Sequence, residues 1–533
     1  MKFSSKPQVR MALDVLALVC VFVALIIPNR LEWITPLSFL FLPLELIVAG
    51  LLLLVPRVGG RVLRTVLAVL LATGLVFKVA DLIVYEIFAR PFNPVFDLYL
   101  LDDGLRLVTG AFGRVDAIVL TLLLLLVFAL IFLGAFAVLG RLQLRLQQWS
   151  RHSLPALGGL LLVWIALYVV GFSRVNTYFY DELVEHMEAI VDSLHDIKSF
   201  AATLNTDKFA TVRGEQLFNK LRGKDVLVVF VESYGRTVFD DPEFAKEVKP
   251  NFDWANSQFE LNGLQARTAY LTSPTVGGIS WLAHGTLLSG LWINNQLRYD
   301  SLVMSERPTL NRLFKRAGWR TLGVMPGISM AWPEGQYFGF DQTYTAANLG
   351  YKGLPFNWIT MPDQFVLAAL QAAERGERPR APIMAELALI SSHAPWTPVP
   401  DLIPWSQIGD GTIFNSQAVA GPDPDYVWAE TSRIREQYQK SIIYVIDTLA
   451  SYAIQFGDDN LVMIIMGDHQ PAPLVTSDSA SADVPVHIIA RDPAVMAAIA
   501  DWRWSEGLIP AEDAPVWRMD SLRDRLVEAF SGE

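Results

Sequence analysis

The chain has 533 residues, of which 52% are hydrophobic, and its formal net charge is −11. It is longer than one ordinary domain, and its apolar share is high for a water-soluble protein. Residues 1–172 hold 14 Lys and Arg against 9 Asp and Glu, whereas residues 173–533 hold 29 against 45. The acidic part argues against a nucleic-acid partner, because phosphate backbones bind basic surfaces. The only cysteine, Cys20, has no partner for an intrachain disulfide.

Five apolar stretches are long enough, or nearly so, to cross a bilayer, which takes about 20 helical residues. They cover residues 11–27, 36–55, 65–85, 117–139 and 155–172. The first stretch shows no small-residue cleavage site and is followed by four more, so we interpret it as an anchor and not as a signal peptide. Residues 1–172 are therefore predicted to form a five-span transmembrane domain.

Basic residues gather before the first, third and fifth stretches: Lys2, Lys6, Arg10, Arg57, Arg61, Arg64, Arg141, Arg145 and Arg151. Loops rich in Lys and Arg stay in the cytoplasm. Five spans that start inside would place residues 173–533 outside. The sequence thus predicts a multi-pass protein of the bacterial inner or plasma membrane with an extracytoplasmic C-terminal part.

Three ionisable residues fall within the apolar stretches. Glu45 lies in the second stretch, and Lys78 and Asp81 lie a helical turn apart near the outer end of the third. Ionisable groups at membrane depth face protein or a water-filled cavity, because exposure to lipid is costly. Pairing that locks helices together is one interpretation, and a position beside a lipid head group is the other.

The polar segment 173–224, with helical periodicity around residues 180–200, is predicted to be a helical connector. Beyond it, short β-rich runs alternate with helical patterns: 226–231, 321–325, 383–390, 461–466 and 484–490. Runs that are apolar throughout are typical of strands buried on both faces of a mostly parallel sheet. The predicted fold is a multi-pass α-helical membrane domain followed by an α/β domain over residues 225–533.

Polar residues follow three of these runs. Glu232 follows the first, His393 follows the third, and Asp468 and His469 follow the fourth within the sequence Gly-Asp-His-Gln-Pro. Ligands of α/β sheets bind outside the carboxyl ends of the strands, so these side chains are candidates for one site. Carboxylates, an imidazole and a hydroxyl suit Mn²⁺ or Zn²⁺, and Mg²⁺ is a further option.

A hydroxyl-rich loop, Ser-Pro-Thr-Val-Gly-Gly-Ile-Ser, ends at Ser280 and precedes an apolar run of helical character. Its glycines permit the backbone conformations of a nucleophile turn, and a helix start offers free N–H groups to an anion. Taken alone, the loop is also typical of an ordinary helix N-cap. The three polar strand ends make it a candidate part of the site.

Together these residues resemble the alkaline phosphatase superfamily, most closely the lipoteichoic acid synthase type and its sulfatase-like relatives. That family has an acidic residue after its first strand, then a Thr or Ser nucleophile, a His and an Asp-His pair. The resemblance implies one divalent metal, with ligands that are listed next by their positions in this chain: Glu232, Ser280, Asp468 and His469. It also implies that His393 binds the substrate or protonates the leaving group.

The resemblance leaves two hydroxyls as the possible nucleophile. Ser280 begins a run with the spacing that the family places behind its nucleophile, and Thr275 is the residue type usual in the synthase branch. His284, one turn beyond Ser280, either faces the substrate or is an ordinary polar residue of the helix. Trp332 matches the tryptophan of a Trp-x-Arg motif that holds glycerol phosphate, but the arginine is Glu334 here. This change puts a glycerol phosphate substrate in doubt.

The implied function is transfer of a phospho-alcohol group, of phosphoglycerol or phosphoethanolamine type, from a phospholipid to an envelope glycan or lipid. The group would pass through a covalent phospho-Ser or phospho-Thr. A formylglycine sulfatase is not expected, because Cys20 lies in an apolar stretch and the Ser280 motif lacks the required Pro and Arg. A phosphodiesterase or phosphatase, and an inactive envelope sensor or scaffold, are the alternatives.

Overall fold

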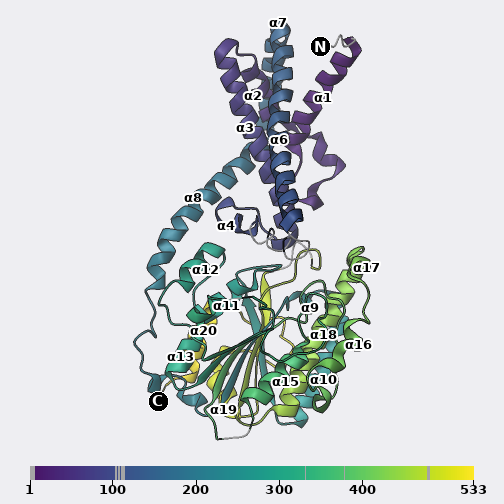
Figure 1. The fold of residues 1–533 in the computed structure, drawn as a ribbon. Coiled ribbons are helices and arrows are strands. Elements are labelled where there is room, and N and C mark those ends of the chain that lie inside the picture. The colour runs from purple at the N-terminus through teal and green to yellow at the C-terminus, as the bar shows by residue number, and fades with distance from the viewer. Residues whose placement is uncertain are drawn as a thin grey trace. The chain divides into compact units, whose positions relative to one another are not determined.

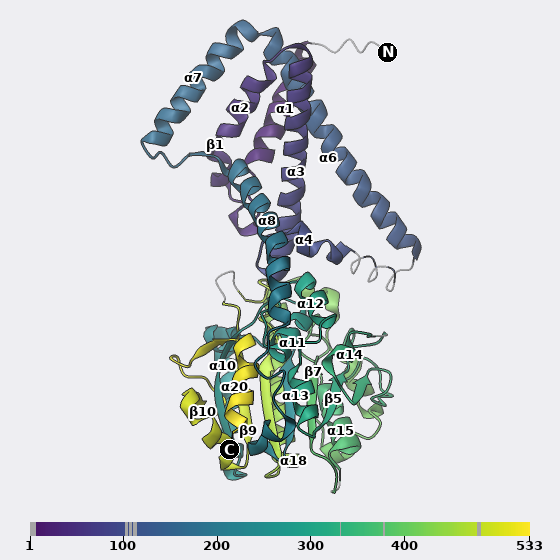
Figure 2. The ribbon, with the colours of Figure 1, turned by 90° about the vertical axis from the view of Figure 1, so that its left-hand side faces the viewer.

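The computed structural model describes residues 7–101, 105, 109, 114–330, 332–376, 379–476 and 481–532. The chain divides into two compact units. The membrane unit consists of Met1–Tyr85 and Arg90–Asp196, and the α/β unit consists of Glu86–Ala89 and Ile197–Glu533. Figures 1 and 2 show the elements of both units.

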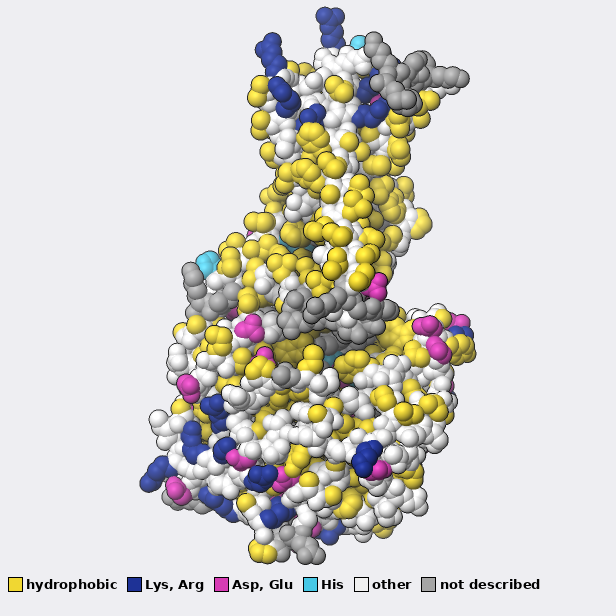
Figure 3. Space-filling view, in the orientation of Figure 1, with side chains coloured by type: hydrophobic (Ala, Val, Ile, Leu, Met, Phe, Trp, Pro, Cys, Tyr) yellow, Lys and Arg dark blue, Asp and Glu magenta, His cyan; other side chains and the backbone are white. Residues whose placement is uncertain are grey.

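Within the described ranges of the membrane unit, four helices are long and apolar enough to cross a membrane. They are α1 (Pro7–Ile26), α3 (Arg57–Phe88), α6 (Arg114–Gln148) and α7 (Ser150–Val169). Hydrophobic side chains cover their outer surfaces (Figure 3). The predicted multi-pass membrane domain is confirmed.

The second predicted span, residues 36–55, differs from a full crossing. It forms a 3₁₀ turn over Pro36–Leu40, a short strand β1 (Leu42–Pro43) and the helix α2 (Leu44–Leu53). Proline has no backbone N–H and disfavours a helical conformation at the residue before it, so Leu42 is extended and α2 begins after Pro43. Ten helical residues span about 15 Å, half of a bilayer core. Five crossings remain a prediction.

The basic ends of the membrane helices lie together. The guanidinium groups of Arg141 and Arg145, near the end of α6, both pair with Asp14 in α1, at 2.6 and 2.5 Å. The side chain of Gln147 donates to the carbonyl oxygens of Leu53 and Val55 at the end of α2. Successive helices therefore alternate in direction, and Lys and Arg gather at one end of the unit (Figure 3).

Lys78 and Asp81 in α3 each pair with a residue of α8 (Tyr178–Leu204). The Lys78 ammonium lies 2.6 Å from Glu182, and Asp81 lies 3.1 Å from His186. Asp81 also accepts a hydrogen bond from Asn29 at 2.9 Å. The interpretation that these charges lock helices together is confirmed, although the partners come from α8 and not from each other.

The α/β unit is built on a sheet whose nine described strands follow the order β10-β4-β9-β8-β3-β7-β5-β6, with β11 paired to β4. Strands β8, β3, β7, β5 and β6 are mutually parallel, and β9 is antiparallel to β8 and β4. The five predicted runs correspond to β3 (Asp225–Val231), β5 (Arg320–Met325), β7 (Ile383–Leu389), β8 (Leu461–Gly467) and β9 (Asp483–Ala490). The mostly parallel sheet is confirmed.

Four strands were not predicted: β4 (Gln265–Thr272), β6 (Gln342–Thr345), β10 (Ser505–Glu506) and β11 (Val516–Arg518). They lie toward the two ends of the sheet and mix polar with apolar residues. Their sequences therefore lack the continuous apolar run that marks a strand buried on both faces.

Helices cover both faces of the sheet (Figures 1 and 2). One face carries α10 (Pro242–Leu261), α15 (Asp363–Glu374) and α18 (Thr431–Phe456). The other carries α11 (Ser280–Ser289), α12 (Gln296–Val303), α13 (Leu310–Arg316), α19 (Pro493–Ala498) and α20 (Asp520–Phe530).

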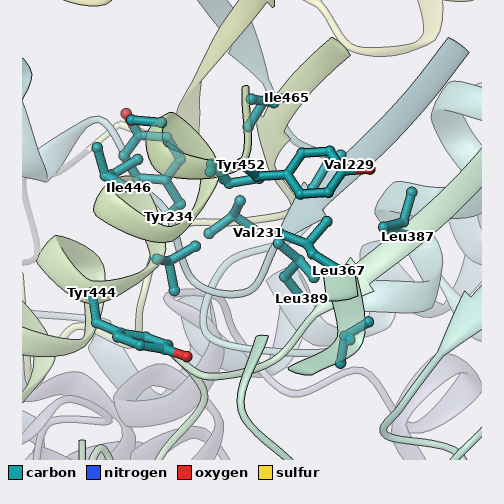
Figure 4. Packing of buried hydrophobic residues seen from close by; sticks show 14 of the residues in the cluster. Val229, Val231, Tyr234, Leu367, Leu387, Leu389, Tyr444, Ile446, Tyr452 and Ile465 are labelled. Carbon is teal, nitrogen blue, oxygen red and sulfur yellow. The ribbon is translucent and has the colours of Figure 1, made fainter. Parts of the chain in front are cut away.

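Alternate residues of the central strands pack into the two layers. Val229, Val231 and Leu387 point into the first layer, where they pack with Tyr444 and Tyr452 of α18 (Figure 4). Each such buried aliphatic side chain contributes roughly 1.5–3 kcal/mol to folding. Two-sided burial explains the apolar runs. The parallel pairing of β3 with β7 and with β8 brings the carboxyl ends of these strands together at one edge of the sheet.

Candidate active site

A cluster of two carboxylates and an imidazole lies at the carboxyl ends of β3 and β8. Glu232 follows β3, and Asp468 and His469 follow β8. Their oxygen and nitrogen atoms lie within 4.8 Å of one another, and all three side chains are buried. His469 Nε2 is 3.1 Å from Glu232 Oε1. The structure thus brings together the three residues that the sequence indicated as metal ligands.

Backbone hydrogen bonds fix the orientation of this cluster. His469 Nδ1 lies 2.7 Å from the carbonyl oxygen of Gln470, which can only accept, so Nδ1 carries a hydrogen and Nε2 faces Glu232. Asp468 Oδ1 accepts the backbone N–H groups of Ser233 and His469, at 2.8 and 2.6 Å. Ser233 has a φ of 57°, a left-handed conformation that turns its N–H toward Asp468.

The pKa values of the three groups in the cluster depend on one another. Burial would lower the pKa of His469, but the negative charges of Asp468 and Glu232 outweigh it and raise the pKa to about 9. Burial and the charge of Glu232 raise the pKa of Asp468, while for Glu232 burial is outweighed by the charge of His469 and the pKa falls. The buried cluster therefore retains protons on Asp468 and His469. A divalent cation could replace these protons, so the donor set fits a metal.

Ser280 lies against this cluster at the start of α11. Its Oγ donates a hydrogen bond of 2.8 Å to Glu232 Oε2 and lies 3.3 Å from His469 Nε2. The preceding Ile279 has a φ of 63°, which is strained for a β-branched residue and costs about 1–3 kcal/mol. Such strain persists where a site requires it, and here it places Ser280 at a helix N-terminus, where N–H groups can meet a phosphate.

Thr275, the other candidate nucleophile, has a different environment. Its Oγ1 donates a hydrogen bond of 2.8 Å to the carbonyl oxygen of Gly278 and so stabilises the loop before α11. Gly277 and Gly278 have φ values of 76° and 153°, which residues other than glycine rarely adopt. Of the two candidate hydroxyls, Ser280 is thus the one that hydrogen-bonds to the carboxylate–imidazole cluster.

His393 lies on the loop after β7. Its Nδ1 donates to the carbonyl oxygen of Ala394 at 2.6 Å, which leaves Nε2 for another partner. Its positive charge contributes to the lowered pKa of Glu232, so the two side chains are close enough to interact. The ring stacks on the half-exposed indole of Trp358, with centroids 4.0 Å apart. Trp358 was not predicted, because no pattern in the sequence links it to His393.

The other two predicted substrate-binding residues, His284 and Trp332, pack against aromatic side chains. His284 is buried, stacks on Phe230 with ring centroids 3.8 Å apart, and pairs with Glu386 of β7 at 2.7 Å. His284 thus lies in the protein interior, and its role in substrate binding remains a prediction. Trp332 packs on Phe338 and Phe340, and its role in substrate binding remains a prediction.

A buried carboxylate that the sequence did not indicate holds the loop before His393. Asp363 is the first residue of α15 and has no exposed surface. Its Oδ1 accepts the N–H groups of Ile390 and Ser391, at 2.9 and 3.1 Å, and its own N–H donates to Ser391 Oγ. Ser392, the next residue, donates through Oγ to the carbonyl oxygen of Glu232 at 2.5 Å. Asp363 therefore connects α15 with the site.

We predict that Asp363 makes the stability of the α/β unit depend on pH. Burial raises the pKa of Asp363 to about 7, despite hydrogen bonds that lower it. The pKa of Asp363 is higher in the folded than in the unfolded protein. Its contribution to stability is therefore fully present at low pH and is lost as the pH rises through about 7. In Asp363→Asn this loss should disappear. The stability difference between wild type and variant should therefore shrink from about pH 5 to about pH 8.

Thermal unfolding of the full-length protein in detergent at both pH values measures this difference. Other titrating groups are common to the two proteins and cancel in the comparison. A stability difference that is the same at both pH values would show that Asp363 ionises normally.

Comparisons with known proteins return remote structural matches. No protein-family model and no curated protein sequence matches the chain. The lipooligosaccharide phosphoethanolamine transferase A (EptA) of Neisseria meningitidis is 13% identical over 97% of this chain and 95% of its own, with a TM-score of 0.47. The phosphoglycerol transferase GacH of Streptococcus pyogenes, in complex with sn-glycerol-1-phosphate, is 12% identical over 63% and 82%, with a TM-score of 0.38.

A third match is the C-terminal periplasmic domain of Escherichia coli EptC in complex with zinc. It is 16% identical over 51% of this chain and 75% of its own, with a TM-score of 0.35. A Vibrio parahaemolyticus protein among the matches is described as a member of the alkaline phosphatase superfamily.

Proposed function

We propose that the protein is a metal-dependent transferase that moves a phospho-alcohol group from a phospholipid to an envelope glycan or lipid. The observation that carries this proposal is the hydrogen bond from Ser280 to Glu232 within the buried Glu232, Asp468 and His469 cluster. A hydroxyl at a helix N-terminus, beside a metal-ligand set, is arranged for attack on a phosphoester. The membrane unit favours a substrate that is itself a lipid.

Glu232, Asp468 and His469 would hold one divalent cation, with Ser280 beside it. A cation bound there would lower the pKa of the Ser280 hydroxyl and screen the charge of the phosphate. Mixed oxygen and nitrogen donors favour Mn²⁺ or Zn²⁺ over Mg²⁺. The zinc complex of the E. coli EptC domain supports zinc.

The chain's own residues account for the transfer of the group. Ser280 Oγ forms a bond to phosphorus, and its proton passes toward Glu232 Oε2, which already accepts that hydrogen bond at 2.8 Å. The bond between phosphorus and the diacylglycerol oxygen breaks, and His393 Nε2 donates a proton to the departing alcohol. The N–H groups at the start of α11 bind the phosphate oxygens.

In the second half of the reaction, an acceptor hydroxyl displaces Ser280 from phosphorus. His393, now neutral, takes the proton of that hydroxyl, and Ser280 recovers its own. A glycan or lipid acceptor makes the enzyme a transferase, and water as the acceptor would make it a hydrolase. We propose an extracytoplasmic location for the α/β unit, where envelope acceptors are found.

We expect the full-length protein, reconstituted in vesicles with Mn²⁺ or Zn²⁺, to convert a head-group-labelled phospholipid into diacylglycerol. Phosphatidylethanolamine and phosphatidylglycerol are the two donors to compare, with an envelope extract as the acceptor. Mass spectrometry should find the labelled phospho-alcohol on an acceptor molecule. Release of the label only in water-soluble form would indicate a hydrolase. Absence of diacylglycerol with either donor and either metal would contradict the proposal.

A further inference from the structure

The membrane unit contains a cavity of about 460 Å³ that the proposed reaction does not use. Its walls come from α1, α2, α3, α6 and the beginning of α8, all within the membrane unit. Apart from Glu45, Thr177 and Tyr180, the lining consists of hydrophobic residues, among them Ala49 and Leu52 of α2. This volume is within the range of ligand-binding cavities, about 300–1,000 Å³.

The polar residues of the lining lie at one end of the cavity. Glu45 is the second residue of α2, and the backbone N–H of Tyr180 donates to Glu45 Oε1 at 2.8 Å. Thr177 directly precedes α8. Leu52, seven residues further along α2, is about 10 Å away from Glu45 and close to the basic end of the unit. The cavity is therefore polar at one end and apolar along the rest of its length.

Glu45 also has an unused hydrogen-bonding atom. Its Oε2 is buried and has no hydrogen-bond partner among the residues that the structure describes. A buried acceptor without a donor costs roughly 1–3 kcal/mol, and such atoms in a folded protein require an explanation. A ligand that brings an N–H or O–H group to this end of the cavity would satisfy it.

We propose that the cavity binds one acyl chain of a membrane phospholipid and that Glu45 accepts a hydrogen bond from the polar part of this lipid. An amphiphile matches the division of the lining into a polar end and an apolar length. The lipid is available because three of the surrounding helices, α1, α3 and α6, are long and apolar enough to cross a bilayer. The ammonium of an ethanolamine head group and the hydroxyls of a glycerol head group both supply the donor. The inference concerns the membrane unit and does not rest on the proposed function.

Photocrosslinking tests the acyl-chain site. The full-length protein is reconstituted in phosphatidylethanolamine vesicles with a trace of the same lipid carrying a diazirine in one acyl chain. After illumination, peptide mapping should find label on α2 and α3 at cavity-lining residues. Ala49→Phe and, independently, Leu52→Phe fill the cavity and should lower this labelling several-fold. Ala129→Phe makes the same change at an exposed position of α6 outside the lining and should leave it unchanged.

A second comparison tests the role of Glu45. Wild-type protein should take up diazirine-labelled phosphatidylethanolamine or phosphatidylglycerol in preference to phosphatidylcholine, whose head group has no hydrogen-bond donor. Glu45→Leu should lose this preference and keep the acyl-chain labelling. Label spread evenly over the lipid-facing helices, or unaffected by both phenylalanine variants at the cavity, would overturn the acyl-chain site. A head-group preference that survives in Glu45→Leu would overturn the role of its carboxylate.

Discussion

Replacing Ser280 with alanine is expected to lower the rate of diacylglycerol formation by roughly 10⁴-fold or more. The variant loses the oxygen that would bond to phosphorus, and no other hydroxyl hydrogen-bonds to Glu232 Oε2 among the described residues. Thr275→Ala should cost only about tenfold, because it removes one hydrogen bond to Gly278 that stabilises the loop. The two substituted residues are only five positions apart in the chain, so the two variants form a matched pair.

The vesicle assay with labelled phospholipid measures both rates. A phospho-adduct trapped by acid quenching should map to Ser280 in the wild type and be absent from Ser280→Ala. Melting temperatures equal to that of the wild type would show that both variants keep the fold. Label on Thr275, with Ser280→Ala still turning over, would assign the nucleophile to Thr275.

The central part of the α/β unit could be predicted from the sequence because its strands are buried on both faces. Burial from two sides leaves no polar position in residues 226–231 of β3 or 461–466 of β8, so each appears as an uninterrupted apolar run. The polar residue after such a run must lie at the edge of the sheet. Glu232, Asp468 and His469 could therefore be assigned to one site without knowledge of the strand order.

Features that depend on contacts between distant segments could not be predicted in this way. Trp358 stacks on His393, although the two residues are 35 positions apart in the sequence. Asp363, at the start of α15, accepts hydrogen bonds from residues 390 and 391 in the loop after β7. The position of His284 on α11 does not reveal its partner, because Glu386 comes from β7, 102 residues further along the chain. The short helix α2 has a different reason: a single proline, Pro43, interrupts a stretch whose composition is otherwise typical of a full span.

Asp468→Asn is expected to remove the metal and to lower the rate of transfer by at least about 10³-fold, while the fold is retained. The amide oxygen of asparagine can still accept the N–H groups of Ser233 and His469, so the local backbone has its partners. The substitution removes one of two buried negative charges, and the metal then loses an anionic ligand. Without metal, the variant should be at least as stable as the wild type, because Asp468 and Glu232 no longer repel each other.

In the presence of metal, the wild type should instead be more stable than Asp468→Asn. A cation that binds only the folded state stabilises it by RT ln(1 + [L]/Kd), about 2.7 kcal/mol at a hundred times Kd. Adding Mn²⁺ or Zn²⁺ to chelator-treated protein should therefore raise the melting temperature of the wild type and leave that of Asp468→Asn unchanged. Asp253→Asn, at an exposed carboxylate of α10, is the matched control and should respond like the wild type. Elemental analysis gives the metal content directly. Stoichiometric metal in Asp468→Asn, or an equal rise in melting temperature, would place the cation at other residues.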